Sequence, residues 1–267
     1  MSFKRYLSYV RMSFKFMITK RAMTLFWVLT KPIALLVAVA VWTAIFDYSG
    51  QGVIAGLTLE QTINYMIFSV VFGGLTSVFI GQLLGRAIHR GTLTTSLFKP
   101  VDYGVSRLFN HIGDRWIYTF IFEVLPGLFI AVVFFGFSQF SVLMTVLSMV
   151  SLFFGFIINY FLSLDWALMY FKTIEYDHMD WLKRTIFRFF SGSYLPLNFF
   201  PVSLQSLFGL LPFQFITYVP AMIFIGGFSL SHSLMLILVE VGWCVLLYSV
   251  YRVAWHFVVK NFAGVGV

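Results

Sequence analysis

Three acidic residues lie within or beside otherwise apolar stretches and are the side chains best placed to do chemistry: Glu123, Asp165 and Glu240. A carboxylate in the middle of a membrane span costs about 2.5–3.5 kcal/mol to insert, so such residues usually face the interior of a helix bundle. Glu123 and Glu240 are therefore either pathway groups that contact a cationic substrate or relay protons, or structural partners of a neighbouring span or hydroxyl. Asp165, close to the end of its stretch, is the weaker candidate.

Motifs for catalysis, nucleotide binding and metal binding are absent from the sequence. It contains no phosphate-binding loop ending in Gly-Lys, no Gly-x-Ser-x-Gly and no His-Glu-x-x-His. The five histidines are scattered, and the single cysteine, Cys244, excludes an internal disulfide and a cysteine metal cluster. We therefore expect no catalytic residue, cofactor or metal in this chain.

The composition is that of an integral membrane protein. Of 267 residues, 60% are hydrophobic and 10% are charged, whereas soluble domains have about 25% charged residues. So few charged side chains cannot cover a surface that faces water. The composition excludes a disordered chain, a coiled coil and a nucleic-acid-binding domain, and it predicts an all-α membrane protein whose residues 1–267 form one domain.

Apolar stretches with few or no charged residues predict six membrane spans. A helix needs about 20 mostly apolar residues to cross ~30 Å of hydrocarbon. The expected spans are residues 25–46, 62–83, 117–136, 141–163, 182–195 and 232–256. The fifth is the shortest, and a polar turn at 136–139 divides the third from the fourth. Gly81 and Gly85, near the end of the second span, predict close packing against another helix.

The basic residues predict the orientation of these spans. All 18 Lys and Arg fall in four segments: 1–31, 86–115, 172–188 and 252–260. The loops on the other side, 47–61, 137–140 and 193–231, contain none. Because cytoplasmic loops are enriched in Lys and Arg, we expect a multi-pass protein of the cell membrane. Both termini, including a tail at 257–267, should be cytoplasmic.

The first 21 residues predict an amphipathic helix at the membrane surface. One helical face carries the apolar residues Phe3, Leu7, Val10, Phe14 and Met17. Basic residues on a neighbouring face suit anionic lipid headgroups. The helix is either an anchor for the bundle at 22–256 or also a docking surface for a cytoplasmic partner.

The loop at 86–115 is the longest cytoplasmic connection. Between Gly91 and Lys99 it has room for one or two helical turns. Leu93, Leu97 and Phe98 are apolar residues on a segment expected to face water. Either a protein partner covers them or the loop folds back on the bilayer.

The segment at 193–231 has no charge, yet four prolines divide it into pieces too short to span: Pro196, Pro201, Pro212 and Pro220. Irregular backbone at membrane depth persists only where protein or a water-filled cavity satisfies its polar groups. We expect re-entrant helices, chiefly at 193–213, entering from the outer face. The alternative is an ordinary loop on the outer surface.

Two motifs resemble those of a known family. The first reads Ser191-Gly192-x-x-Leu195-Pro196-Leu197-x-x-Phe200-Pro201, followed by Leu211-Pro212-Phe213 and Tyr218-x-Pro220. The second reads Arg90-Gly91-x-Leu93, followed by Leu97-x-Lys99-Pro100-Val101-Asp102. With the six spans and the amphipathic N-terminal segment, they make nearly the whole chain resemble the permease subunit of type-2 ATP-binding-cassette (ABC) transporters, mostly exporters. The charge-rich stretch at 175–188 departs from that pattern.

The resemblance implies transport powered by other subunits. A separate cytoplasmic ABC ATPase dimer would bind the ATP, and a second copy of this permease or a paralogue would complete the pathway within the membrane lipids. No nucleic acid is expected as a partner. The resemblance assigns ATPase coupling to Arg90, Gly91, Leu93, Leu97 and Lys99. It assigns an outer gate to Pro196, Phe200, Pro201, Pro212 and Phe213.

Two other functions compete with this one: a membrane-embedded lipid-modifying enzyme and a scaffold subunit that transports nothing. An enzyme would need two or more polar catalytic residues at one depth, and the three acidic residues are scattered along the chain. An ATPase that co-purifies with the chain would distinguish these alternatives. The sequence leaves the substrate open among lipids, hydrophobic drugs, peptides and glycan-lipids.

Overall fold

The computed structural model describes residues 3–19, 21–99, 101–135, 141–173 and 175–260, and most of them are helical. The N-terminal half contains α1 (Phe3–Ile18), α2 (Arg21–Ser49), β1 (Val53–Ile54), β2 (Leu57–Thr58), α3 (Leu59–Phe72), α4 (Ile80–His89), α5 (Leu93–Leu97), α6 (Tyr103–His111), η1 (Ile112–Ile117), η2 (Phe120–Val124) and α7 (Leu125–Phe135). The C-terminal half contains α8 (Val142–Ala167), η3 (Leu168–Phe171), α9 (Tyr176–Phe190), η4 (Leu197–Phe199), α10 (Val202–Leu210), η5 (Pro212–Ile216), α11 (Tyr218–Phe224) and α12 (Leu230–Lys260).

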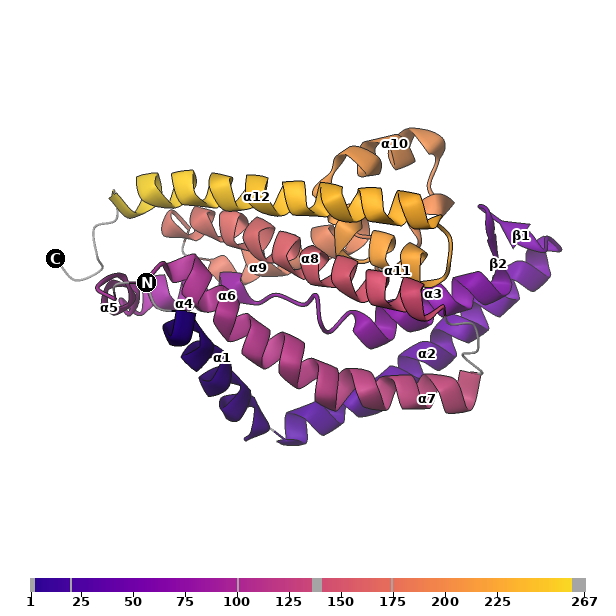
Figure 1. Cartoon of the computed structure of the whole chain (residues 1–267), viewed down its shortest axis with the longest axis horizontal. Coiled ribbons are helices and arrows are strands. Elements are labelled where there is room, and N and C mark those ends of the chain that lie inside the picture. The colour runs from indigo at the N-terminus through magenta and orange to yellow at the C-terminus, as the bar shows by residue number, and fades with distance from the viewer. Residues whose placement is uncertain (1–2, 20, 100, 136–140, 174, 261–267) are drawn as a thin grey trace.

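Helix α8 is the centre of the bundle. It packs along α12 and also contacts α11, η5 and α4, and α8 and α12 run side by side along the long axis (Figure 1). Short α5 lies toward one end of the molecule, near the C-terminal end of α12, and the β1–β2 hairpin lies at the other (Figure 1). The expectation of an all-α membrane protein is confirmed, apart from this two-residue hairpin.

Four helical stretches are long and apolar enough to cross a membrane. They are Val28–Ser49, Tyr103–Phe134, Val142–Phe171 and Leu230–Lys260. These correspond to the first, third, fourth and sixth expected spans. The third begins earlier than expected, because α6 and the π-helical turns η1 and η2 lead directly into α7. The polar turn expected at 136–139 lies outside the described residues.

The second expected span is not one continuous helix. Helix α3 ends at Phe72 and α4 begins at Ile80, with irregular backbone between them. The side chains of Thr76 and Ser77 donate hydrogen bonds to the carbonyl of Gly73, and the amide of Asn159 on α8 donates to the Thr76 carbonyl at 2.7 Å. The protein thereby satisfies part of the backbone that the break exposes, as burial in a membrane requires.

The fifth expected span, 182–195, is not among the stretches of the described chain that are long and apolar enough to cross a membrane. Helix α9 begins at Tyr176 and ends at Phe190, so the charged residues of this region lie on the helix rather than in a loop before it. After α9 the chain turns at Gly192, whose φ of +78° favours glycine. Tyr65 on α3 donates a hydrogen bond to the Gly192 carbonyl at 2.8 Å and so fixes this turn.

The amphipathic N-terminal helix is confirmed as α1, although Met1 and Ser2 lie outside the described residues. It packs against α6 and η1, where Tyr6 lies 5.0 Å from Phe109 between ring centroids and Ser13 donates to Asn110 at 2.9 Å. Leu7 and Phe16 remain exposed. Part of its apolar face thus packs on the bundle and part remains available to lipid.

Candidate functional site

The segment expected to couple the chain to an ATPase is anchored to the bundle by buried apolar side chains. Gly91 follows α4 with a φ of +68°, and α5 comes two residues later. Leu93 is 0% exposed and belongs to the main hydrophobic cluster, with half-buried Leu97 packed against it. Leu93 therefore does not face water as the sequence suggested. The apolar side chain that faces outward is that of Phe98, which is 88% exposed.

Two of the coupling candidates are charged and exposed. Arg90 caps the C-terminal end of α4, and Lys99 follows Phe98; both side chains are exposed to solvent. Pro100 of the same motif lies outside the described residues. The outward surface of this segment is thus one aromatic ring with a basic side chain next to it.

A partly exposed polar cluster connects the chain just after α5 to α12. Asp102 caps α6 by accepting a hydrogen bond from the amide of Val105 at 2.9 Å, and it forms an ion pair with Arg252 on α12 at 2.6 Å. The Tyr251 hydroxyl accepts from the Gly104 amide at 2.9 Å and donates to Asp102 at 3.3 Å. We call these residues, Asp102, Gly104, Tyr251 and Arg252, the α6–α12 latch.

Close packing makes the latch specific. A β-carbon at Gly104 would lie 2.6 Å from the Tyr251 ring, so only glycine fits there. Tyr160 on α8 donates to the Gly104 carbonyl at 2.7 Å, and Tyr103 stacks on Trp255 with ring centroids 5.1 Å apart. Asp102 belongs to one of the two motifs given above. Its partners on α12, Tyr251 and Arg252, lie 149 and 150 residues away in the chain, so the motif alone does not identify them.

Three prolines of the segment at 193–231 lie at the starts of short helices rather than at their ends. Pro196 and Pro201 precede the short helices η4 and α10, and Pro212 begins η5. Pro220 instead lies in the first turn of α11, where a helix tolerates proline because the amide hydrogen there has no partner within the helix. The pieces are therefore short, as the sequence predicted.

The candidate gate residues lie in an aromatic cluster. Pro196 and Pro212 are buried, Phe200 and Phe213 are half-buried, and Pro201 is exposed. The rings of Phe200 and Phe208 lie 5.2 Å apart, and those of Phe190 and Phe213 lie 5.7 Å apart. Edge-to-face and tilted contacts of this kind join the end of α9 to α10 and η5.

A cavity of about 220 Å³ lies beside this cluster, between α10, η5, α11 and α12. Its lining mixes aliphatic, aromatic and polar side chains, with His232 as its one acidic or basic side chain. The lining residues are Leu197, Gln205, Gly209, Gln214, Tyr218, Val219, Phe228, His232 and Leu236. The Gln205 amide donates to two nearby backbone carbonyls, so part of the polar lining holds α10 in place.

Each of the acidic candidates Glu123 and Glu240 faces a partner within the bundle. Glu123 lies 3.7 Å from Lys31, whose ammonium also donates to the Val71 carbonyl at 3.1 Å. Ser151 on α8 donates to Glu240 on α12 at 2.6 Å. These are the contacts of the structural alternative, and a direct role in a pathway stays a prediction. Lys31 lies within the first expected span, 25–46, and within the apolar stretch Val28–Ser49, where it pairs with Glu123.

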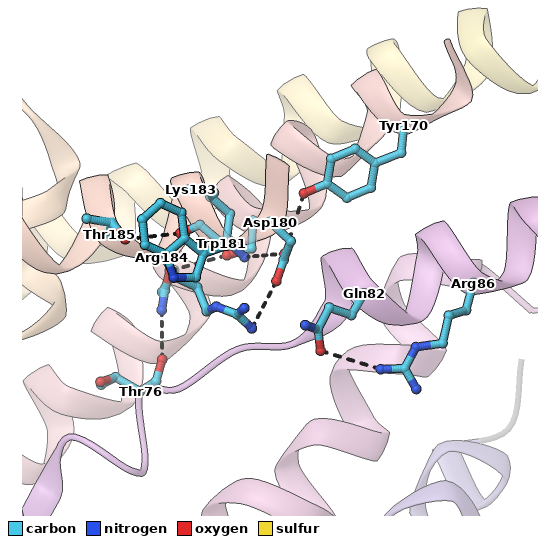
Figure 2. A network of polar contacts seen from close by, with 11 residues as sticks. Thr76, Gln82, Arg86, Tyr170, Asp180, Trp181, Lys183, Arg184 and Thr185 are labelled. Atoms are coloured by element: carbon cyan, nitrogen blue, oxygen red, sulfur yellow. Dashed lines mark hydrogen bonds and ion pairs between the residues drawn. The ribbon is translucent and has the colours of Figure 1, made fainter. Parts of the chain in front are cut away.

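Sequence reasoning missed a charged cluster on α9. Asp180, which is 0% exposed, lies 3.1 Å from both Lys183 and Arg184, and Tyr170 donates to it at 3.4 Å. Figure 2 shows Asp180 between these side chains, with Gln82 and Arg86 on α4 close by. The unusual charge density at 175–188 was the available signal, but it was interpreted as a loop.

Glycine on α4 allows α9 to approach closely. A β-carbon at Gly81 would lie 2.2 Å from a carboxylate oxygen of Asp180, and one at Gly85 would lie 2.3 Å from the Tyr176 ring. The helix packing predicted from these two glycines is therefore confirmed, and the partner is α9. Among the described residues, no group of three or more His, Cys, Asp and Glu side chains could hold a metal ion.

Comparison with known families gives one match that covers most of the chain. Residues 32–266 match the ABC-2 family transporter protein family. A search of curated proteins found no match. The matched region includes every element described above except α1 and the beginning of α2.

Proposed function

The chain belongs to the ABC-2 family of transporter proteins and is a membrane permease subunit; we propose that it forms half of the pathway of an exporter driven by a separate ATPase dimer. The observation that carries the proposal is the exposed aromatic Phe98 on a segment whose other apolar residues are buried or half-buried. Such a projection is typical of a residue that fills a pocket on a protein partner. A second copy of the chain or a paralogue completes the pathway.

In this proposal the chain crosses the membrane six times. The four long helices are four of these spans. Helices α3 and α4 together form the second span, and α9 forms the cytoplasmic part of the fifth. Orientation follows from the Lys and Arg distribution, with both termini, α1 and α5 in or near the cytoplasm. The short helices from η4 to α11 then enter the membrane from the outer side as re-entrant elements.

The α6–α12 latch supports a route for coupling. Because Asp102 lies directly after the α5 segment and is paired with Arg252, displacement of α5 by the ATPase would be transmitted to α12. The break between α3 and α4 lets α4 move with α5 while α3 keeps its position. ATP binding and hydrolysis would thus bias two arrangements of the bundle, and the aromatic cluster near Phe200 would open or close the outer side.

Co-purification tests the proposal directly. We expect an affinity-tagged chain expressed in its native host to bring down an ABC ATPase in stoichiometric amounts. Orientation is tested in parallel on a Cys244→Ser background with a thiol reagent that does not cross membranes. In intact cells the Tyr48→Cys variant should react and the Phe98→Cys variant should not. Repeated absence of an ATPase, or outside labelling at position 98, would contradict the proposal.

Removing the Tyr251 hydroxyl should weaken coupling. The Tyr251→Phe variant leaves the buried amide of Gly104 without its acceptor, at a cost of about 1–3 kcal/mol. We expect a lower melting temperature and less transport per ATP hydrolysed in reconstituted vesicles. Tyr248→Phe, three residues earlier on α12, is the matched control and should change neither quantity. Equal behaviour of the two variants would show that the latch does not transmit motion.

A further inference from the structure

Two arginines from different helices converge on one aromatic ring at the break in the second span. The guanidinium carbon of Arg115 on η1 lies 4.5 Å from the ring centroid of Phe79, and that of Arg184 on α9 lies 5.6 Å from it. Phe79 is the last residue before α4. Each contact is attractive on its own, but two guanidinium groups on one ring repel each other.

Positive charge exceeds negative charge at this place. Asp180 is shared between Lys183 and Arg184 at 3.1 Å each, and Arg115 is a third cation, which gives three cations to one carboxylate. Counting Asp114, which precedes Arg115 in η1, the cations still outnumber the carboxylates three to two. Lys183 is buried and paired with Asp180, whereas Arg115 and Arg184 are partly exposed. The two guanidinium groups can therefore meet an anion that is not part of the chain.

The cluster cannot neutralise itself by moving Asp180. That carboxylate lies against Gly81 so closely that no β-carbon fits there, and Tyr170 donates to it as well. Meanwhile the Nε of Arg115 is buried and makes no hydrogen bond to any described atom, and the Arg184 side chain remains 27% exposed. Donors are therefore left over beside Phe79.

We propose that Arg115 of η1 and Arg184 of α9, whose guanidinium groups both lie on the ring of Phe79, bind the phosphate group of an amphiphilic molecule. Guanidinium groups match the oxygens of a phosphate in a two-pronged geometry. Trp181, one turn before Arg184 on α9, is 63% exposed and offers an apolar surface for the rest of the molecule. Arg115 and Arg184 are the phosphate-binding residues.

The position of this site connects phosphate binding to transport. It lies where α4 separates from α3, so a bound phosphate would contact three elements that coupling moves relative to one another. This interpretation rests on the proposed function, whereas binding itself does not. The test is therefore made on the purified chain in a maltoside detergent, without ATPase and without ATP.

Thermal unfolding measures binding with three probes: dioleoyl phosphatidic acid, dioleoylglycerol and inorganic phosphate. We expect phosphatidic acid to raise the melting temperature and dioleoylglycerol, which lacks the phosphate, to leave it unchanged. An equal rise with inorganic phosphate at the same concentration would identify a soluble phosphate as the ligand of the same site. An equal rise with dioleoylglycerol would overturn the proposal.

Variants locate the site. Arg115→Gln and Arg184→Gln should each weaken phosphatidic acid binding about tenfold, since each removes one charged hydrogen-bonding group. Arg86→Gln on α4, which removes an exposed guanidinium bonded to Gln82, is the control and should bind as the wild type does. Without ligand, the two site variants should be as stable as the wild type or more so, because repulsion is relieved. Lower stability together with unchanged binding would overturn the proposal and assign both arginines a structural role.

Discussion

A Phe98→Asp variant should lose its association with the ATPase. Phe98 is 88% exposed, and the buried Leu93 holds its segment in place, so the ring is a rigid projection. Anchors of this kind contribute about 2–4 kcal/mol, which corresponds to an affinity weakened by about 30-fold or more. Co-purification of the tagged variant should recover little ATPase, and ATP-driven transport should stop.

The control replaces a similarly exposed aromatic residue with the same acidic residue. Tyr48, at the end of α2 beside the hairpin, is 96% exposed, and Tyr48→Asp should retain the ATPase. Leu93→Asp is not a clean test, because it would place a carboxylate in the core rather than alter the docking surface. Undiminished ATPase recovery with folded Phe98→Asp protein would reject the docking role of this segment.

An Asp180→Asn variant should fail to accumulate as folded protein. The change leaves Lys183, which is 1% exposed, and Arg184 without their shared carboxylate. Breaking a buried ion pair from one side costs about 3–5 kcal/mol, a large part of the stability of a typical domain. We expect aggregation and a much smaller monodisperse peak in size-exclusion chromatography after membrane extraction.

Two further variants show whether charge is the cause. Asp177→Asn, one turn earlier on α9 and exposed, should behave as the wild type does. Adding Lys183→Met to Asp180→Asn removes one orphaned cation and should recover much of the folded protein. A double variant as poorly folded as the single one would show that the carboxylate acts through its shape and hydrogen bonds instead.

The long spans could be predicted from the sequence because a single signal, a long apolar stretch, identifies each of them. In α8 and α12 a long and mostly apolar stretch is enough to predict the helix, and the expected bounds differ from the observed ones by a few residues. The same holds for α1, whose apolar residues recur at helical spacing. The prolines likewise predicted short pieces between η4 and α11, since a missing amide hydrogen acts locally.

Structural features that depend on residues distant in the sequence could not be predicted. The break after α3 contains no proline, and it persists because Asn159 of α8 satisfies the Thr76 carbonyl. Lys31 lies inside an expected span, but hydropathy does not show that Glu123, 92 residues away in the chain, is its partner. The charged residues of α9 indicated a loop for the same reason. The cost of placing a charge in or near a membrane depends on its partners, and the sequence alone does not show those partners.

The wide turns η1 and η2 interrupt the regular winding of the helix that carries α6 and α7. Each residue of a regular α-helix rotates the chain by about 100°, and a π-helical turn accommodates one residue more than regular winding allows. Deleting a single residue from Ile112–Ile117 would let this turn wind regularly, with little rotation of α6 about its axis, so Asp102 should stay beside Arg252. In the evolution of this chain, one amino acid can therefore be lost here while the faces of the flanking spans keep their partners.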